Sequence, residues 1–266
     1  MHEGATQVRM DGKVAIVTGA GTGIGRAIAL RLGTAGALTL CADIDEAAAS
    51  GTAEEIGAAG GHGEGVRCDV SDADDMDRLV ARAAELGGPH ALVSNAAIQY
   101  EHLLVDTPPD DWDRVLGTNL KSVYLGARAV IPHMRRLGGG SIVNMASVNG
   151  FWVEPALAAY CAAKGGVINL TRAIALENGR YQIRCNCICP GYIDTGMAQR
   201  YFEIQDDPEA AREVAGKMHA LGRVGRPEEV AAMALFLCSD EASFCTAQPF
   251  IVDGGLSAGV SAGPDL

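Results

Sequence analysis

The sequence predicts an α/β fold, in which a single Rossmann-like, doubly wound parallel sheet of seven strands carries helices on both faces. Short apolar runs alternate with helical stretches along the 266 residues, which is typical of a parallel sheet. A glycine-rich loop follows the first run, and the length suits one large α/β domain. We expect that domain to span residues 11–256, between a flexible N-terminus at 1–10 and a C-terminal tail at 257–266.

Seven short apolar runs bounded by glycine or polar residues are the predicted strands. They span residues 13–18, 37–42, 65–70, 91–94, 141–145, 183–188 and 250–252. The first, KVAIVT, leads directly into the glycine-rich loop, and the second ends at Asp43. Cys185 and Cys187 lie in the sixth and Cys189 directly follows it; the three alternate, so a strand would place them on one face. Buried core thiols are the favoured interpretation, because a flat row of strand residues does not converge on a metal.

Alanine-rich or periodic stretches between these runs are the predicted helices. They span residues 24–35, 46–59, 72–86, 109–137, 156–178, 209–218 and 227–238. Ser71 is the expected cap of the third helix. Pro108, Pro109 and Pro132 are expected to interrupt the fourth.

Composition and charge argue against several classes of partner. The formal net charge is −12, without a basic stripe that could neutralise nucleic-acid phosphates, and negative charge disfavours anionic lipid. No apolar run approaches the ~20 residues needed to cross a bilayer, and the first ten residues lack a secretory apolar segment. None of the eight cysteines forms a CxxC pair, and the six histidines show no ligand spacing. We therefore expect a cytoplasmic protein with a small-molecule substrate, no nucleic-acid or membrane partner and no metal.

The loop after the first predicted strand, TGAGTGIG at 18–25, is typical of a phosphate cradle. Glycines let the backbone approach a pyrophosphate, and the following helix offers free N–H groups and the positive end of its dipole. The spacing is Gly19-x3-Gly23-x-Gly25, which differs from the usual GxGxxG. A structural turn is the alternative, but the position between a strand and a helix favours dinucleotide binding.

Asp43, at the end of the second predicted strand, indicates which dinucleotide is bound. Its carboxylate could accept hydrogen bonds from the adenosine ribose hydroxyls and would repel a 2′-phosphate. Neither Thr22 nor Ala42 nor Ile44 supplies a compensating cation. The sequence therefore favours NAD over NADP.

Ser147, Tyr160 and Lys164 form the candidate catalytic group. Tyr160 and Lys164 are four residues apart, so a helix would place both side chains on one face. A free tyrosine has a pKa near ~10, and we expect the Lys164 ammonium to lower the pKa of Tyr160. Tyr160 could then exchange a proton with an alcohol or ketone while a hydride moves to or from nicotinamide. Ser147, just past the fifth strand, could hold the substrate oxygen.

Together these residues resemble the short-chain dehydrogenase/reductase family of the standard NAD-linked type, across residues 11–255. The matching motifs are TGAGTGIG at 18–25, Asp69-Val70, SNAA at 94–97, Asn119, the serine of NMAS, YCAAK at 160–164 and PGYIDT at 190–195. The resemblance implies a catalytic set of Asn119, Ser147, Tyr160 and Lys164. It implies a cofactor-binding set of Gly19, Thr22, Gly23, Ile24, Gly25, Asp43, Asp69, Val70, Asn95, Ala96, Tyr160, Lys164, Pro190, Gly191, Ile193 and Thr195.

The resemblance also implies particular roles and an assembly. Asp69 and Val70 would contact adenine, while Ile193 and Thr195 would contact the nicotinamide carboxamide. Lys164 would additionally bind the nicotinamide ribose. Asn119 would kink its helix and hold a water that connects Lys164 to solvent. A homotetramer is implied, assembled through the helices that hold Asn119 and Tyr160 and through the last strand.

The sequence departs from the family pattern twice. Ala97 replaces the last glycine of the usual NNAG, and Ala247 replaces the glycine of a Thr-Gly pair, with Pro249 nearby. Neither position belongs to the catalytic set. They could alter the local backbone geometry or a subunit contact.

Substrate selection is expected from three stretches, at 99–102, 149–154 and 196–205. The candidate pocket residues are Gln99, Asn149, Trp152, Glu154, Met197 and Tyr201. These stretches also hold Tyr100, Phe151 and Phe202, which favours an apolar or ring-containing alcohol, although they could instead pack a lid or a subunit interface. Glu154 and Asn149 could select a polyol or sugar. The stretch 196–218 should be a mobile lid.

Three hypotheses of function follow from these residues. The first is an NAD-dependent oxidoreductase acting on a secondary alcohol or its ketone, with a cyclic, aromatic or polyol substrate. The alternative is a 3-oxoacyl thioester (acyl-carrier-protein) reductase, which predicts NADPH and a basic patch for the carrier. The remote alternative is a non-enzymatic, dinucleotide-sensing regulator, which would be expected to lose Tyr160 or Lys164; both are present.

Overall fold

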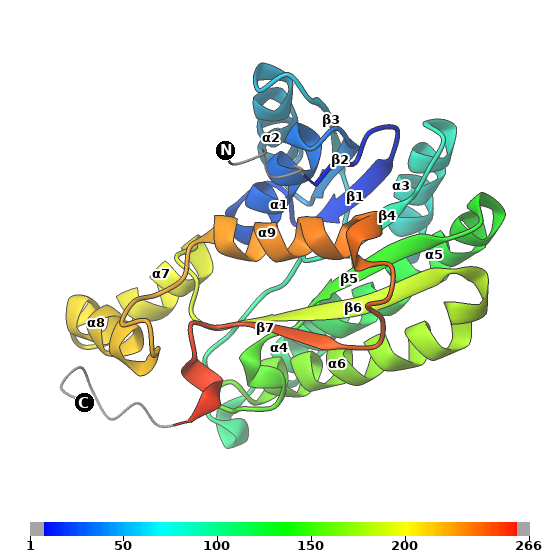
Figure 1. Ribbon diagram of the computed structural model, residues 1–266. Coiled ribbons are helices and arrows are strands. Elements are labelled where there is room, and N and C mark those ends of the chain that lie inside the picture. Colours follow the sequence, from blue (N-terminus) through cyan, green and yellow to red (C-terminus); the bar gives the residue numbers. More distant parts are fainter. Residues whose placement is uncertain (1–7, 260–266) are drawn as a thin grey trace.

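The computed structural model describes residues 8–259, which form one parallel sheet with helices on both faces (Figure 1). The seven strands lie in the order β3-β2-β1-β4-β5-β6-β7, and every neighbouring pair is parallel. The chain therefore builds outward from the centre, first toward β3 and then toward β7. This is the doubly wound arrangement that the sequence predicts.

The bounds of the elements are as follows. The strands are β1 (Val14–Thr18), β2 (Leu38–Asp43), β3 (His62–Arg67), β4 (Ala91–Ser94), β5 (Gly140–Met145), β6 (Ile183–Pro190) and β7 (Pro249–Val252). The helices are α1 (Gly23–Thr34), α2 (Glu46–Ala58), α3 (Ala73–Glu85), α4 (Pro109–Leu116), α5 (Ser122–Leu137), α6 (Ala158–Asn178), α7 (Gly196–Glu203), α8 (Pro208–Met218) and α9 (Pro227–Cys238). Short 3-10 turns include η1 (Leu104–Asp106), η3 (Val148–Gly150) and η6 (Leu256–Ala258), and a π-helical turn, η2 (Gly117–Lys121), joins α4 to α5.

Both faces of the sheet are buried, which explains why the strands read as continuous apolar runs. In β1, Ala15 and Val17 belong to the core formed with α1, α2 and α9, while Val14 and Ile16 belong to the core formed with α3, α5 and α6. Figure 1 shows α1 and α9 side by side on one face, with α5 and α6 on the other. The predicted core cysteines of β6 are buried free thiols, as expected.

Two predicted details of the first half are wrong. The third strand is β3, which ends at Arg67, because Arg67 completes the register with Asp43 of β2 and the chain then leaves the sheet. The cap of α3 is Asp72, whose carboxylate accepts hydrogen bonds from the N–H groups of the first turn. Ser71 instead donates its hydroxyl proton to Asp69 Oδ1 at 2.7 Å.

The predicted long helix at 109–137 is interrupted at η2 rather than at Pro132, which lies inside α5. The cause is Asn119, whose amide exchanges two hydrogen bonds with the backbone of Ile98. Asn119 Nδ2 donates to the Ile98 carbonyl at 2.8 Å, and the Ile98 N–H donates to Asn119 Oδ1 at 2.9 Å. These bonds fasten the widened turn to the segment after β4.

Helix α7 was not predicted as a helix. Thr195 caps it, with its hydroxyl accepting from the Ala198 N–H at 3.3 Å. No helix within residues 8–259 combines the length and the apolar character needed to cross a membrane.

The predicted C-terminal tail begins in an ordered turn. Ser257 lies in η6 and donates two hydrogen bonds to Asp253 Oδ2, from its N–H at 2.7 Å and its hydroxyl at 2.6 Å. The rest of the predicted tail, at 260–266, and residues 1–7 of the predicted flexible N-terminus lie outside the described residues.

Candidate active site

A cavity of about 420 Å³ opens at the carboxyl edge of the sheet. Its wall comes from the segments that directly follow six strands, β1 to β6, with α6 and α7 completing it. The strand order reverses between β1 and β4, so the cavity lies at the switch point where open α/β sheets bind ligands.

The glycine-rich loop forms one end of this cavity. Gly19 and Gly23 have φ values of +63° and +55°, a region that disfavours side chains. A Cβ on Gly25 would lie 1.9 Å from the Gly19 carbonyl oxygen, so the loop can fold this tightly only with glycine there. Thr22 precedes α1 without capping it through its side chain, which leaves the first N–H groups of α1 available for an anion. The loop therefore fits the pyrophosphate of a dinucleotide.

Asp43 lies beside the loop, where an adenosine ribose would reach it. Its Oδ2 accepts a hydrogen bond from the Gly21 N–H at 2.9 Å, and its Oδ1 accepts one from the Asp45 N–H at 3.1 Å. Both oxygens are thereby fixed in place, and the side chain still lines the cavity. Acceptor capacity remains on each oxygen for ribose hydroxyls.

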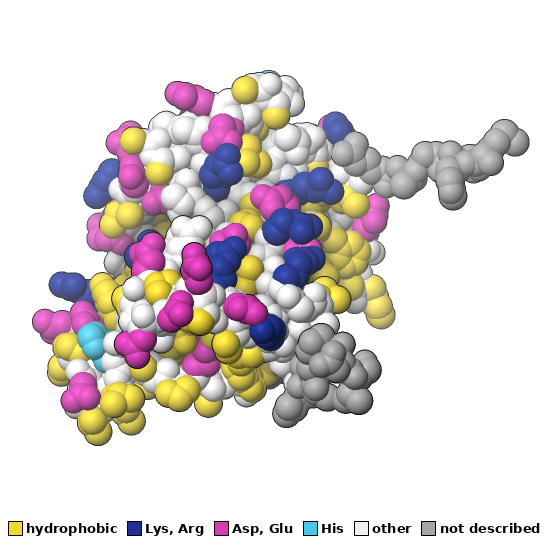
Figure 2. Space-filling model, turned by 90° about the vertical axis from the view of Figure 1, so that its left-hand side faces the viewer, with side chains coloured by type: hydrophobic (Ala, Val, Ile, Leu, Met, Phe, Trp, Pro, Cys, Tyr) yellow, Lys and Arg dark blue, Asp and Glu magenta, His cyan; other side chains and the backbone are white. Residues whose placement is uncertain are grey.

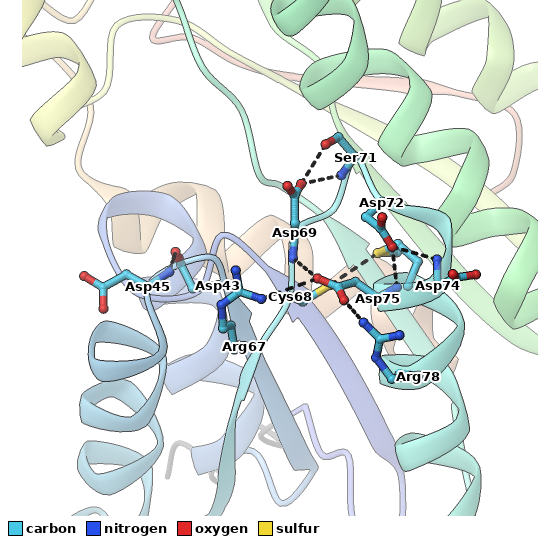
Figure 3. A network of polar contacts seen from close by, with 11 residues as sticks. Asp43, Asp45, Arg67, Cys68, Asp69, Ser71, Asp72, Asp74, Asp75 and Arg78 are labelled. Atoms are coloured by element: carbon cyan, nitrogen blue, oxygen red, sulfur yellow. Dashed lines mark hydrogen bonds and ion pairs between the residues drawn. The ribbon is translucent and has the colours of Figure 1, made fainter.

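Figure 3 shows the neighbouring network of acidic residues at the ends of β2 and β3. Asp69 Oδ1 accepts from the Ser71 backbone N–H at 2.9 Å, and the Asp69 N–H donates to Asp75 Oδ2 at 2.8 Å. Sequence reasoning missed Arg67, the register partner of Asp43, whose guanidinium lies 3.8 Å from Asp75. The hydrogen bond from Asp69 and the charges of Arg78 and Arg67 lower the pKa of Asp75, so Asp75 is ionised and engages Arg67.

At the other end of the cavity, Ser147 follows β5 and meets Tyr160 and Lys164 of α6. Lys164 is 2% exposed; its Nζ donates to the Met145 carbonyl at 2.7 Å and lies 5.4 Å from the centroid of the Tyr160 ring. The Ser147 hydroxyl accepts a hydrogen bond from the Asn149 N–H at 3.1 Å, and its own proton can be donated to the Tyr160 oxygen or to a substrate oxygen.

The expectation that Lys164 lowers the pKa of Tyr160 is wrong for this structure. Burial raises the pKa of Tyr160 to about 12, and its hydrogen bond with Ser147 opposes that rise only in part. Burial also lowers the pKa of Lys164 to about 8. Both shifts have the same physical cause, because loss of solvent penalises the phenolate and the ammonium alike. Tyr160 is therefore a protonated phenol here.

All six predicted pocket residues line the cavity, namely Gln99, Asn149, Trp152, Glu154, Met197 and Tyr201. Of the other aromatic candidates, Phe202 is buried and Phe151 is half-exposed over a separate shallow hollow that includes Ile251. Sequence reasoning missed Tyr192 as a pocket residue, although it belongs to the PGYIDT motif. Its hydroxyl donates a hydrogen bond to Glu154, and its ring centroid is 6.1 Å from that of Tyr201.

Two of the predicted cofactor and catalytic residues do not line the cavity. Gly25 lies behind Gly19, and Asn119 is buried against Ile98. The remaining predicted residues are all on the wall. Of the two departures from the family pattern, Ala97 lines the cavity, and Ala247 has a φ of +63°, where the family has glycine.

Comparison with known proteins shows what the chain is similar to. Residues 19–257 match the family described as enoyl-(acyl carrier protein) reductase. The 3-oxoacyl-(acyl-carrier-protein) reductase of Thermotoga maritima is 38% identical over 250 residues, covering 94% of this chain and 99% of the relative. The meso-2,3-butanediol dehydrogenase of Serratia marcescens is 38% identical over 252 residues, covering 94% and 97%.

A mammalian relative and a solved structure are likewise similar to this chain over most of its length. The (3R)-3-hydroxyacyl-CoA dehydrogenase of Rattus norvegicus is 37% identical over 262 residues, covering 95% of this chain and 99% of the relative. The crystal structure of a short-chain type dehydrogenase/reductase from Mycobacterium marinum superposes with a TM-score of 0.88 at 34% identity, covering 95% and 98%.

Proposed function

The chain belongs to the short-chain dehydrogenase/reductase family, and we propose that it transfers a hydride between NAD(H) and a secondary alcohol or its ketone. One observation carries the proposal: Ser147, Tyr160 and Lys164 face the same cavity as the glycine cradle and Asp43. A regulator that only senses a dinucleotide would have no need of this group. The oxidoreductase class itself follows from the relatives, which act on hydroxyl or keto groups.

Tyr160 and Ser147 are the proposed catalytic residues that touch the substrate oxygen. Ser147 would hold that oxygen by donating its hydroxyl proton, and Tyr160 would donate a proton to a ketone or accept one from an alcohol. Bound NAD would supply the acceptor for the hydride that leaves the carbinol carbon. In oxidation the alcohol thus loses a hydride from carbon and a proton from oxygen, and it becomes a ketone.

Lys164 is the proposed proton conduit behind Tyr160. A pKa of about 8 allows Lys164 to exchange a proton near neutral pH, whereas Tyr160 alone holds its proton tightly. Asn119, fixed to Ile98 beside α6, is the proposed next step toward solvent. The neutral phenol suits ketone reduction directly. In alcohol oxidation Tyr160 must first release its proton through Lys164.

NAD is the proposed cofactor because of Asp43. Its fixed carboxylate offers acceptors to two ribose hydroxyls and repels a 2′-phosphate. The nearby Arg67 does not cancel the repulsion of a 2′-phosphate by Asp43, because its guanidinium faces the ionised Asp75. Gly23 and Thr22 of the cradle would hold the pyrophosphate, while Asp69 and Val70 would border the adenine.

A 3-oxoacyl thioester reductase is the second candidate, favoured by the printed activity of the Thermotoga maritima relative. It would use NADPH and present a basic surface to an acyl carrier. On the face drawn in Figure 2, Lys and Arg side chains lie among Asp and Glu rather than in one patch. Together with Asp43, this favours the alcohol dehydrogenase, with a cyclic, aromatic or polyol substrate.

A homotetramer in the cytoplasm completes the proposal. The edge strand β7 exposes half of Ile251, and the half-exposed Phe151 lies over the same shallow hollow. Such an edge is normally covered. The helices that hold Asn119 and Tyr160 would form the second contact.

The proposal is tested by oxidation of a panel of secondary alcohols, polyols and hydroxy acids, with NAD and NADP in parallel. We expect turnover of at least one neutral secondary alcohol, with a higher kcat/KM for NAD than for NADP. A clear preference for NADP would overturn the cofactor assignment. Turnover of 3-oxoacyl thioesters alone would favour the second candidate.

A further inference from the structure

A carboxylate with two neutral hydrogen-bond donors stands on the substrate side of the cavity. The Tyr192 hydroxyl donates to Glu154 Oε1, and Asn149 Nδ2 donates to Glu154 Oε2 at 3.0 Å. All three side chains line the cavity. The two donors come from different elements, η3 and the segment after β6, so the carboxylate is held between them and cannot rotate freely.

This carboxylate lies close to the proposed reacting position. The Asn149 side chain binds Glu154, and the Asn149 backbone N–H donates to Ser147 Oγ at 3.1 Å. One residue therefore connects Glu154 to the hydroxyl that would hold the substrate oxygen. The negative charge of Glu154 also contributes, after burial, to the raised pKa of Tyr160, which places the two groups within electrostatic reach.

Acceptors outnumber donors in this network. No Lys, Arg or His nitrogen lies within 4 Å of a Glu154 carboxylate oxygen in the part of the chain that the structure describes. A carboxylate offers roughly four acceptor sites, of which the protein uses two. Asn149 is 6% exposed, and its buried Oδ1 has no donor among residues 8–259. A ligand with a hydrogen-bond donor could therefore bind to these unused acceptor sites.

Arg200, in the last turn of α7, is another cation on the cavity wall. A Cβ on Gly196 would lie 3.6 Å from Arg200 Nη1, and a Cβ on Gly23 would lie 3.3 Å from Thr195 Cγ2. The start of α7 thus lies beside the glycine cradle. Arg200 makes no ion pair with Glu154 among residues 8–259.

We propose that Glu154 is a specificity-determining residue that accepts a hydrogen bond from a second hydroxyl group on the substrate, adjacent to the carbinol that reacts. The inference rests on the proposed function and narrows its substrate class to neutral vicinal diols and the matching α-hydroxy ketones. Asn149 and Tyr192 act as positioning residues for the carboxylate. An unneutralised carboxylate at this place disfavours substrates that carry a negative charge.

The test compares three substrates with the same four-carbon chain, namely 2-butanol, 2,3-butanediol and 3-hydroxybutyrate. We expect wild-type kcat/KM with NAD to be at least about tenfold higher for the diol than for 2-butanol, and lowest for the acid. Glu154→Gln keeps the shape and removes the charge. It should reduce the diol preference about tenfold, mainly through KM, and raise kcat/KM for 3-hydroxybutyrate.

Two further variants separate specificity from folding. Tyr192→Phe removes one donor to the carboxylate and should weaken the diol preference less than Glu154→Gln does. Glu54→Gln is the matched control, because Glu54 is an exposed residue of α2 and does not line the cavity. It should leave the preference unchanged. NADH binding, followed by fluorescence, shows that each variant is folded.

An unchanged ratio of diol to 2-butanol in folded Glu154→Gln would overturn the inference, as would 3-hydroxybutyrate as the best wild-type substrate. Either result would leave the proposed function standing, because 2-butanol or the acid would still be oxidised. If no alcohol is oxidised with either dinucleotide, the proposed function fails and the inference fails with it.

Discussion

Burial of Lys164 predicts that the proposed catalytic lysine destabilises the fold at neutral pH. The side chain is 2% exposed, and burial lowers its pKa from 10.5 to about 8. A shift of that size corresponds to roughly 3 kcal/mol at about 1.36 kcal/mol per pH unit. Lys164→Met keeps the apolar chain but leaves the Met145 carbonyl without its donor, which costs about 1 kcal/mol. The variant should therefore be more stable than wild type by about 2 kcal/mol.

The sign of the pH dependence follows from the same shift. Between pH 8 and pH 10.5 the unfolded state holds the lysine proton more tightly than the folded state does, so wild-type stability rises with pH in this window. The advantage of Lys164→Met should therefore be largest below pH 8 and should shrink toward pH 10.5. Proton exchange at Lys164 is lost, so turnover should fall by at least about a hundredfold.

Urea unfolding at one protein concentration, at pH 7 and near pH 10, measures the effect. In a separate thermal unfolding experiment near pH 7, the melting temperature of Lys164→Met should exceed that of wild type by roughly 4–8 °C, at 2–4 °C per kcal/mol for a chain of this size. Lys217→Met is the matched control, because that lysine is exposed and should change stability little. Lower stability of Lys164→Met at pH 7, or a difference that does not narrow at high pH, would refute the reasoning.

Three other changes have defined outcomes. Tyr160→Phe should reduce turnover at least about a hundredfold while NADH binding stays within about threefold, and near-normal turnover would remove Tyr160 from the mechanism. Asp43→Asn keeps an acceptor for the Gly21 N–H but removes the charge, so the NADP-to-NAD ratio of kcat/KM should rise about tenfold; a constant ratio would show that Asp43 does not select the cofactor. Ala247→Gly should raise the free energy of unfolding by about 0.5–1 kcal/mol, because φ at that position is +63° and left-handed backbone costs alanine roughly 1–2 kcal/mol. A lower free energy of unfolding for Ala247→Gly than for wild type, measured by denaturant titration, would contradict the argument from backbone strain.

The sheet could be predicted because its strands are buried on both faces. Val14 to Val17 alternate between two cores, so the whole run is apolar and stands out in the sequence. The glycine cradle could be predicted for a similar reason, since Gly25 leaves no room for a Cβ. Residues under such strong local constraints are recognisable without knowledge of their neighbours.

Features that depend on distant contacts could not be predicted. The resemblance implies a kink at Asn119, but the partner that holds it, the backbone of Ile98, is revealed only by the structure, and the place of Tyr192 in the pocket requires Glu154. The raised pKa of Tyr160 arises from burial, which the spacing to Lys164 does not reveal. The same four-residue spacing places the two side chains near each other but leaves their solvent exposure undetermined.

The most direct test of the account is hydride transfer itself, measured with a secondary alcohol deuterated at the carbinol carbon. After incubation of wild type with NAD, mass spectrometry of the dinucleotide should show one deuterium transferred per ketone formed. Under the same conditions Tyr160→Phe should transfer far less deuterium, because its turnover is lower. Ketone formation without deuterium in the dinucleotide, or equal transfer in the variant, would contradict the account.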